Sequence, residues 1–401
     1  MIRELLCLSI IALTVQTAIA SPPVREDRRL DAGWRFKLGD TAGAEQPSFD
    51  DAGWQHVTLP HNWGWENAQK GEEYYRGPGW YRYWLDAGPQ KGAKRYFLRF
   101  GAAASVAEVF LNGKLVGQHR GAFGAFAVEI TGNLSGTGRE LLAVRASNAL
   151  FPDVAPLSGD FSVFGGLYRP VHFIVTDSVC FTLTDHASPG VVWRQTAVSA
   201  DEAVLDFTAQ ISNGGDQEGR RTLVATVYDA GGGVVKRIDQ SISVAPHITA
   251  PYRIHMVLPH PHLWNGRKDP YLYRAVAELR TADGTVLDEV SQPMGLRFYH
   301  VDPEKGFFLN GEPYHLHGVN RHQDRPDKGW AISEADMRED LGLIKELGCT
   351  VVRCAHYQHS EYFYGLCDSA GILVWAELPQ VDEIGTDDRF AETSRNQLLD
   401  L

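Results

Sequence analysis

Short runs of alternating apolar and polar residues, separated by Gly, Pro and Asn, fill the chain from about residue 28 to residue 177. Alternation with a period of two is the pattern of a strand with one buried face. We predict one such strand over 95–100 and a hairpin over 107–117, because Asn112-Gly113 supplies the two positive-φ residues of a type I′ turn. Many short strands with turn residues between them indicate an all-β sandwich.

The same alternation continues from residue 178 to about residue 296 in longer runs. Three predicted strands stand out, over 202–211, 222–228 and 271–280. Asp283-Gly284 is a turn signal that folds the last of them back on the next apolar run. The length and pattern of this region fit a second sandwich of the immunoglobulin type.

After residue 296 the apolar positions take up a helical spacing. Ser333 opens a predicted helix with a capping-type start, and Gly348 ends it. A second helix is predicted over 360–369. Three predicted strands surround these helices, over 314–320, 350–352 and 372–376. Continuous apolar strands that alternate with helices indicate parallel βα units, here the first three strands of a barrel.

Composition limits the partners of the protein. The 401 residues are 44% hydrophobic and carry a formal net charge of −12 at pH 7. A chain of this length can bury a core in each of the three regions. A negative chain without a basic run offers no field that attracts phosphates, so we predict no nucleic-acid binding and expect a neutral partner.

The N-terminus has the pattern of a targeting segment. An apolar stretch leads to Ala18-Ile-Ala20, an A-x-A cleavage pattern, and we therefore predict a signal peptide over 1–20. The mature protein would be exported, periplasmic or secreted, and free of the membrane. An uncleaved membrane anchor is the alternative, because Glu4 offsets Arg3 in the segment that should be positive. No other uninterrupted apolar run reaches the roughly 18 residues that a membrane helix needs.

Cysteines give no sign of a metal site. Cys7 lies within the predicted signal peptide, which leaves Cys180, Cys349, Cys354 and Cys367. An even number in an exported protein permits disulfides without requiring them. Their spacing is not that of a CxxC metal pair, and we expect buried free thiols.

Several motifs, in their order and spacing, resemble the family 2 glycoside hydrolases, which include β-galactosidases, β-glucuronidases and β-mannosidases. They lie at Leu59–Trp63, Gly79–Arg82, Val109–Lys114, Gly295–Phe298, Phe308–Pro313 and His317–His322. The resemblance covers the chain from about residue 28 to its end. It implies a jelly-roll sandwich of the sugar-binding type over 28–177, an immunoglobulin-like sandwich over 178–296 and the start of a TIM-barrel catalytic domain over 297–401.

The resemblance also implies roles for residues at the ends of the barrel strands. Retaining cleavage of a glycoside needs two carboxyl groups about 5 Å apart, together with side chains that hold the sugar hydroxyls in the transition state. The family pattern assigns substrate contacts to His322 and His356, and orientation of the nucleophile to Arg353. It assigns a supporting role to Glu377, for which a helix-dipole or salt-bridge partner is the alternative. The alternative for the two histidines is that they line loops.

A further candidate lies in the first sandwich. Asp160 stands six residues before Gly166, which matches the aspartate that the family's first domain extends into the barrel pocket. A carboxylate accepts two hydroxyl hydrogen bonds well. The alternative is a turn aspartate, because Gly159 precedes it.

The resemblance places the acid/base glutamate after the fourth barrel strand and the nucleophile glutamate after the seventh. Neither strand is predicted before Leu401. We therefore predict a retaining exo-β-galactosidase acting on a β-linked glycoside or oligosaccharide, with these 401 residues alone inactive. β-Glucuronidase and β-mannosidase are the alternatives within the family, and the oligomeric state stays open.

Two functions of other classes stay open. A non-catalytic carbohydrate-binding protein would use the first sandwich and Asp160. A metal-dependent hydrolase would use His315 and His317, because alternate residues of a strand face the same way and paired histidines on a first barrel strand can begin a metal site. Magnesium occurs in the family's galactosidases on a Glu-x-His after the third strand, but residues 379–384 contain no histidine. We therefore predict no cofactor.

Overall fold

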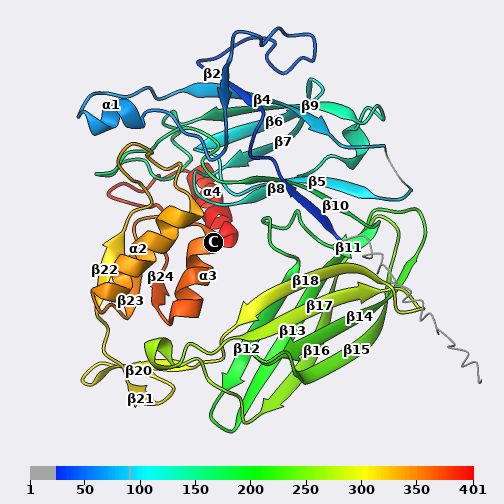
Figure 1. The fold of residues 1–401 in the computed structure, drawn as a ribbon, viewed down its shortest axis with the longest axis vertical. Helices are drawn as coiled ribbons and strands as arrows, with labels where there is room; N and C mark the ends of the chain where they lie inside the picture. Colours follow the sequence, from blue (N-terminus) through cyan, green and yellow to red (C-terminus); the bar gives the residue numbers. More distant parts are fainter. Residues whose placement is uncertain (1–23, 90–91) are drawn as a thin grey trace, which may run out of the picture.

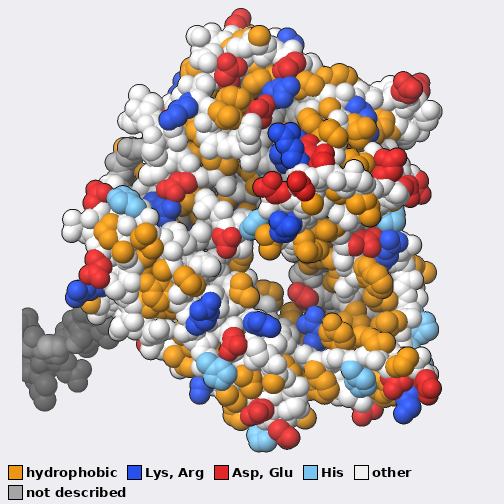
Figure 2. All heavy atoms as spheres, turned by 180° about the vertical axis from the view of Figure 1, so that it is seen from behind, with side chains coloured by type: hydrophobic (Ala, Val, Ile, Leu, Met, Phe, Trp, Pro, Cys, Tyr) orange, Lys and Arg blue, Asp and Glu red, His pale blue; other side chains and the backbone are white. Residues whose placement is uncertain are grey.

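The computed structural model describes residues 24–89 and 92–401. The predicted signal peptide over 1–20 lies outside the described residues. Two β-sandwiches and a helical region form the molecule, with the first sandwich above the second and the helical region beside both (Figure 1). Seen from behind, the three regions surround an opening (Figure 2). Multiple β-sandwiches followed by the beginning of a parallel βα barrel confirm the fold class predicted from the sequence.

Two antiparallel sheets form the first sandwich in the described part of the chain. The larger sheet has the strand order β3-β2-β4-β9-β6-β7, with β2 (Trp34–Leu38), β3 (Gln55–Val57), β4 (Pro78–Asp86), β6 (Val106–Leu111), β7 (Lys114–Arg120) and β9 (Arg139–Ser147). The smaller sheet has the order β1-β10-β5-β8, with β1 (Glu26–Arg29), β5 (Arg95–Phe100), β8 (Phe126–Glu129) and β10 (Val171–Thr176). Helix α1 (Trp65–Gln69) and the short η1 (Thr131–Asn133) lie in the connections. Alternate apolar residues of both sheets fill the space between them, among them Trp34, Tyr81 and Phe173.

The predicted hairpin is present between β6 and β7. Asn112 and Gly113 adopt positive φ angles of 51° and 85°, as a type I′ turn requires. The side chain of Asn112 also accepts a hydrogen bond from the Leu141 backbone N–H at 2.8 Å. This local signal in the sequence is therefore confirmed by the structure.

The second sandwich also consists of two antiparallel sheets. In one of them β13 (Glu202–Asn213) pairs with β11 (Val179–Phe181), β12 (Val191–Val198) and β16 (Thr249–Pro259). The other has the order β15-β14-β17-β18, with β14 (Gly219–Tyr228), β15 (Val234–Val244), β17 (Tyr273–Arg280) and β18 (Val286–Met294). The short η2 (Gly266–Lys268) lies between β16 and β17. Apolar side chains from both sheets form a core of its own, as the alternating pattern predicts.

A small antiparallel sheet, which the sequence pattern does not predict, follows the second sandwich. It contains β19 (Tyr299–Asp302), β20 (Gly306–Leu309) and β21 (Glu312–Pro313). The chain leaves this sheet at Tyr314, whose backbone N–H donates to the Phe307 carbonyl at 2.9 Å. The first barrel strand therefore begins later than predicted.

Three parallel strands form the start of the barrel, in the order β22 (Gly318–Arg321), β23 (Val351–Cys354) and β24 (Leu373–Trp375). Helices α2 (Glu334–Glu346) and α3 (Glu361–Ala370) connect them, and α4 (Asp388–Asp400) follows β24. The prediction of a strand over 314–320 was wrong in its first half, because residues 315–317 lie outside the strand and only the region from Gly318 pairs in register with β23.

The helix boundaries follow the capping signals of the sequence. Ser333 caps α2 by accepting a hydrogen bond from the Asp336 N–H at 3.2 Å, and the Asp336 side chain accepts one from the Ser333 N–H at 2.7 Å. Gly371 ends α3 with a φ of 73°, a conformation that glycine adopts without strain. The capping-type start at Ser333 and the end at Gly371 are confirmed.

The four cysteines within the described residues are all buried and free, as predicted: Cys180, Cys349, Cys354 and Cys367. Burial raises the pKa of Cys354 to about 12. A thiol with such a pKa stays protonated at neutral pH and is a poor nucleophile. Cys354 and Cys367 belong to the apolar core between β23 and α3, so their role is packing.

Contacts between regions fix the first sandwich against the barrel. One apolar cluster joins Phe123, Phe164 and Tyr168 of the sandwich to Trp330 and Tyr357 of the barrel region. The rings of Phe123 and Tyr357 stack with centroids 4.2 Å apart. Such buried aromatic contact holds the two regions in a defined relative position.

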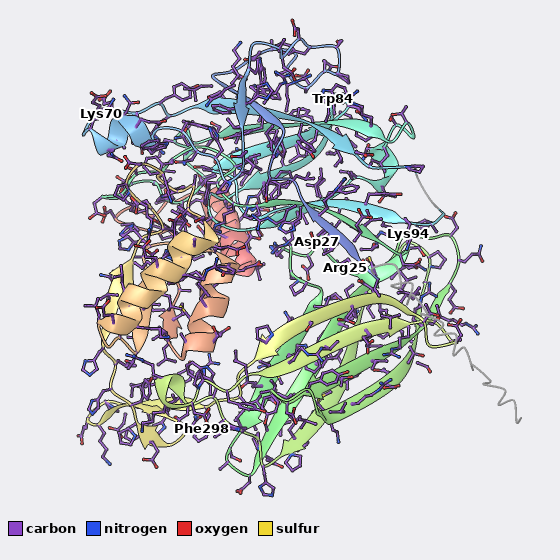
Figure 3. The ribbon with its side chains drawn as sticks, viewed as in Figure 1. Arg25, Asp27, Lys70, Trp84, Lys94 and Phe298 are labelled. Carbon is purple, nitrogen blue, oxygen red and sulfur yellow. The ribbon has the colours of Figure 1, made fainter. Side chains whose placement is uncertain are left out.

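The N-terminal segment is tied to the second sandwich. Arg25 lies near the junction of the two sandwiches (Figure 3) and donates two hydrogen bonds, of 2.8 and 2.7 Å, to the buried carboxylate of Asp288. Such a bidentate pair fixes geometry as well as charge.

Within the described residues, no helix is long and apolar enough to cross a membrane.

Candidate functional site

Four of the five predicted site residues lie at the carboxyl ends of the barrel strands. His322 directly follows β22, Arg353 lies in β23 with His356 two residues beyond its end, and Glu377 follows β24 by two residues. Parallel strands end at one edge, which is where barrel enzymes place their active sites. Pairing of Asn320 with Arg353 in register brings the ends of β22 and β23 together.

Arg353, His356 and Glu377 form one connected group. The Arg353 Nη2 lies 2.7 Å from Glu377 Oε1 and 3.0 Å from His356 Nδ1. His356 Nδ1 is also 3.3 Å from Glu377 Oε1. The guanidinium therefore bridges the carboxylate and the imidazole. Because a guanidinium only donates hydrogen bonds, its contact with Nδ1 leaves the Nε2–H of a neutral His356 free to donate to a ligand.

Glu377 fits the salt-bridge alternative raised from the sequence. Its side chain is 21% exposed and pairs with Arg353, which is 37% exposed. Within the described residues, Glu377 is the carboxylate that pairs with Arg353.

His322 lies beside this group. Its ring stands 5.2 Å from that of His356, nearly perpendicular to it, and its Nδ1 is 3.3 Å from the Tyr357 hydroxyl. Burial lowers the pKa of His322 below its ordinary value, and the positive charge of Arg353 acts in the same direction, as a protonated His356 would. The carboxylates of Asp324 and Asp160 oppose this shift without reversing it. His322 is therefore favoured as a neutral ring at neutral pH.

Asp160 reaches the barrel from the first sandwich. It lies in the connection between β9 and β10, is exposed, and acts electrostatically on His322. The next residue, Phe161, places its ring 6.0 Å from His322 and 5.7 Å from His356. The five predicted residues thus come from two regions of the molecule and lie around the same strand ends.

Sequence reasoning missed three participants. Phe161 packs against both site histidines, Tyr357 contacts the His322 ring nitrogen, and Asp324 contributes charge. Each is adjacent to a predicted residue or two positions from one. Only that proximity along the chain could have indicated them, because their contacts join segments far apart in the sequence.

The position of β22 argues against the metal-dependent hydrolase hypothesis. His315 and His317 are exposed and precede β22, so they lie at the amino end of the strand, opposite His322. The Thr350 N–H donates to the His317 carbonyl at 2.7 Å, which fixes this end of the strand by backbone contacts. Within the described residues no group of three or more His, Cys, Asp or Glu side chains is arranged to hold a metal ion.

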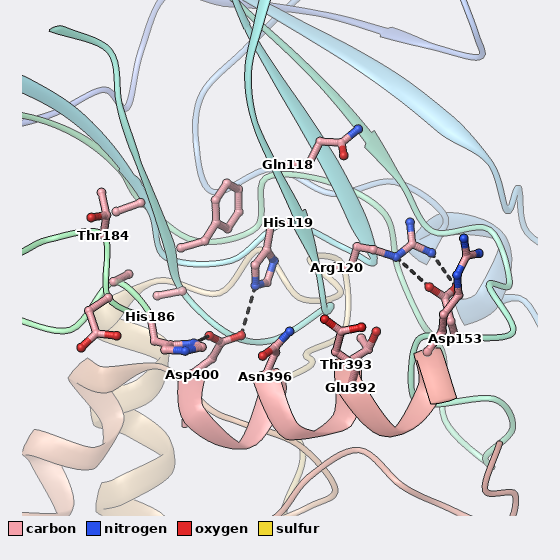
Figure 4. Close-up of a pocket in the computed structure, with 16 residues that line it drawn as sticks. Gln118, His119, Arg120, Asp153, Thr184, His186, Glu392, Thr393, Asn396 and Asp400 are labelled. Atoms are coloured by element: carbon pink, nitrogen blue, oxygen red, sulfur yellow. Dashed lines mark hydrogen bonds and ion pairs between the residues drawn. The ribbon is translucent and has the colours of Figure 1, made fainter. Parts of the chain in front are cut away.

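A polar cleft lies away from this site, between the first sandwich and α4. Its volume is about 670 Å³. Asp400 of α4 accepts hydrogen bonds from His119 Nε2 at 3.2 Å and from His186 Nδ1 at 2.7 Å, and Arg120 binds Asp153 nearby (Figure 4). These bonds fasten α4 to both sandwiches. None of the predicted site residues lines this cleft.

The arrangement at the strand ends suits a polyhydroxyl ligand. It offers imidazole donors, an exposed carboxylate acceptor at Asp160 and the apolar ring of Phe161. Sugars are bound by such combinations of directed polar groups and an apolar surface.

Comparison with known proteins identifies this architecture. Residues 190–297 match the model of the glycosyl hydrolases family 2, and residues 301–399 match that of the glycosyl hydrolases family 2, TIM barrel domain.

The β-glucuronidase of Bacteroides fragilis is 38% identical over 385 residues, covering 94% of this chain and 54% of that protein. β-Galactosidase BoGH2A of Bacteroides ovatus is 29% identical and covers 90% of this chain and 42% of that protein. The chain thus spans about half the length of these curated relatives.

A solved structure supports the same placement. Bacteroides uniformis β-glucuronidase 2, covalently bound to cyclophellitol-6-carboxylate aziridine, superposes with a TM-score of 0.89 at 32% sequence identity. The match covers 93% of this chain and 45% of that chain. The two sandwiches and the first barrel strands are therefore shared as one unit.

Proposed function

This chain belongs to family 2 of the glycosyl hydrolases. We propose that it forms the sugar-holding region of a β-glucuronidase. The substrate is a β-linked glucuronide. The reaction is hydrolysis of the bond between the glucuronate unit and the group that leaves. The enzyme family and the glycoside class of the substrate are those predicted from the sequence motifs.

One observation carries the choice of sugar, the 38% identity with the β-glucuronidase of Bacteroides fragilis over 94% of the chain. The β-galactosidase of Bacteroides ovatus is 29% identical. The structure from Bacteroides uniformis adds support, since its ligand carries a 6-carboxylate, the group that distinguishes glucuronate from a neutral hexose. β-Galactosidase, the first expectation from the sequence, thus has weaker support than its alternative.

The described residues have binding and orienting roles in this proposal. His356 donates from Nε2 to a sugar hydroxyl, His322 lines the same position, and the Asp160 carboxylate accepts from a second hydroxyl. Glu377 keeps Arg353 and His356 in place through the contacts at 2.7 and 3.3 Å. The two catalytic carboxyl groups, which the family places after the fourth and seventh strands, do not belong to the three strands described here.

Sugar binding by this chain tests the proposal directly. Isothermal titration calorimetry with glucuronate and with galactose should show tighter binding of glucuronate. Asp160→Ala should weaken the binding about tenfold, which corresponds to the loss of roughly 1.4 kcal/mol from a charged hydrogen bond. Asp201→Ala, an exposed aspartate of the second sandwich, should leave both affinities unchanged.

One result would overturn the proposed sugar, and another the proposed role of Asp160. Tighter binding of galactose would return the protein to the β-galactosidase expectation. Equal binding by wild type and Asp160→Ala would remove Asp160 from the site and with it the contribution of the first sandwich.

A further inference from the structure

Two buried polar residues lie directly behind the site, Arg321 at the end of β22 and His359 in the segment after β23. Their exposed fractions are 7% and 2%. The Arg321 Nη1 lies 2.9 Å from His359 Nδ1. Neither residue belongs to the group that faces the ligand, and the sequence motifs assign a role to neither of them.

Arg321 is itself held rigidly. Its Nε and Nη2 donate to Asp340 Oδ2 of α2 at 2.9 and 2.6 Å. The guanidinium also lies 4.0 Å from the centre of the Phe363 ring in α3. A guanidinium fixed by a carboxylate on one side and an aromatic face on the other has a single orientation. The remaining nitrogen of the guanidinium, Nη1, makes the contact with His359.

This contact determines the tautomer of His359. A guanidinium only donates, so His359 Nδ1 must be unprotonated and Nε2 must carry the hydrogen. Nε2 lies 3.3 Å from the Ala355 carbonyl oxygen and donates to it. Burial and the adjacent Arg321 hold the pKa of His359 well below its ordinary value, which agrees with a neutral ring.

The acceptor of this bond is the peptide group that precedes a site residue. The Ala355 carbonyl belongs to the peptide bond that joins Ala355 to His356. On its other side, the Ala355 N–H donates to the Arg321 carbonyl at 3.0 Å. Both polar groups of Ala355 are therefore bound, one by the backbone of β22 and one by the His359 ring. The backbone from which the His356 side chain projects has fixed partners.

We propose that Arg321 and His359 are positioning residues for His356, acting through the Ala355 carbonyl. They form a relay from Asp340 in α2 through Arg321 and His359 to the peptide that carries the ligand-facing imidazole. This inference rests on the proposed function, because it gives His356 its part in sugar binding. It goes further in assigning the orientation of His356 to side chains that touch no substrate.

If Arg321 and His359 only filled space in the core, the expected effect of replacing His359 would be different. An apolar side chain of similar volume would fill the space of His359, and the site would not change. In the relay, an apolar replacement removes the donor to Ala355 and leaves Arg321 Nη1 without its acceptor. The two roles therefore separate on a matched pair of substitutions.

The test compares His359→Gln with His359→Leu in the 401-residue chain. The glutamine amide accepts from Arg321 through its oxygen and donates to Ala355 through its nitrogen, whereas leucine does neither. We expect His359→Leu to weaken glucuronate binding about tenfold, because a contact group must be held within roughly 0.5 Å of its productive position. We expect His359→Gln to stay within about threefold of wild type, the small loss that an imperfect geometry causes.

A second readout does not depend on the sugar. With ¹³C-labelled histidine, the ring signal of His356, assigned from a His356→Gln variant, should move in His359→Leu and return toward the wild-type position in His359→Gln. Thermal unfolding of both variants establishes that the binding temperature lies well below their midpoints.

The outcomes separate the two proposals. A folded His359→Leu that binds glucuronate as wild type does, with an unmoved His356 signal, would overturn the relay. Absence of glucuronate binding by the wild-type chain would overturn the proposed function, while a signal of His356 that moves in His359→Leu alone would still support the relay.

Discussion

His322 and His356 owe their surroundings to side chains from several segments of the chain. His322 meets the Tyr357 hydroxyl and the Phe161 ring, and His356 meets the guanidinium of Arg353. Their residue types and strand-end positions are visible in the sequence. Their partners are not, because each ring nitrogen takes its role from whichever donor or acceptor the fold places beside it.

A third histidine shows how burial turns the same side chain into a stability determinant. His61 lies in the first sandwich, where its Nδ1 is 2.7 Å from the Tyr81 hydroxyl and its ring packs 4.6 Å from that of Phe36. Burial lowers its pKa from 6.5 to about 4. The unfolded chain therefore binds a proton at this residue between pH 6.5 and about 4, and the folded chain does not.

Stability should consequently fall as the pH is lowered through this window. The loss attributable to His61 is at most about 1.4 kcal/mol per pH unit, and it is absent above pH 6.5. His61→Gln should reduce the difference in unfolding free energy between pH 7 and pH 5, measured by urea denaturation. The exposed His56→Gln serves as the control and should leave the difference unchanged. A His61→Gln protein with the full wild-type difference would contradict the assignment.

At the scale of elements, α2 is the helix whose start depends most clearly on local sequence. Ser333 and Asp336 form reciprocal hydrogen bonds, and the Lys328 ammonium binds Asp336 at 2.8 Å. Burial opposes ionisation of Asp336, but these bonds outweigh it and lower its pKa to about 2. The cap therefore joins the loop after β22 to the first turn of α2.

Removing the cap should destabilise the barrel region. Ser333→Ala leaves the Asp336 N–H without its acceptor and should lower the free energy of unfolding by about 1 kcal/mol. Ser369→Ala in α3 is the matched control, because its hydroxyl only donates to carbonyls of its own helix, at 3.1 and 3.0 Å. That change should stay within about 0.5 kcal/mol. Urea-induced unfolding measures both, and equal losses in the two variants would refute the cap's contribution.

At the scale of the whole molecule, Arg169 connects the first sandwich to the barrel. Its guanidinium donates to the Phe123 carbonyl at 2.6 Å, to Gln323 Oε1 at 2.9 Å and to the Gln358 carbonyl at 2.7 Å. The residue is 8% exposed. Three buried acceptors from two regions thus depend on one side chain, which lies beside the apolar cluster of Phe123 and Tyr168.

Replacing this side chain should loosen the junction. Arg169→Met leaves three buried acceptors without a donor, and each costs about 1–3 kcal/mol if it is not solvated again. We expect faster amide hydrogen exchange over 355–360 and a lower unfolding midpoint. Arg194→Met, an exposed arginine of β12, should change neither. Unchanged exchange over 355–360 in Arg169→Met would show that the apolar cluster alone holds the regions together.

The order of the secondary-structure elements could be predicted from the sequence, because turns and helix ends depend on residues that are close together along the chain. The hairpin at Asn112-Gly113, the cap at Ser333 and the end of α3 at Gly371 are local signals, and the structure has all three. The start of the first barrel strand could not be read in this way. The apolar Leu316 lies within the predicted strand, yet strand pairing begins only at Gly318, where β23 supplies partners.

The sequence by itself therefore determined the fold class, the family and the residue types at the strand ends, since hydrophobic periodicity and turn chemistry act over a few residues. Only the tertiary structure decided which side chains meet. It placed Asp160 and Phe161 of the first sandwich beside His322, and it set His359 behind His356. Such contacts depend on the packing of whole sheets and helices against each other, and no local pattern encodes the direction in which a distant loop arrives.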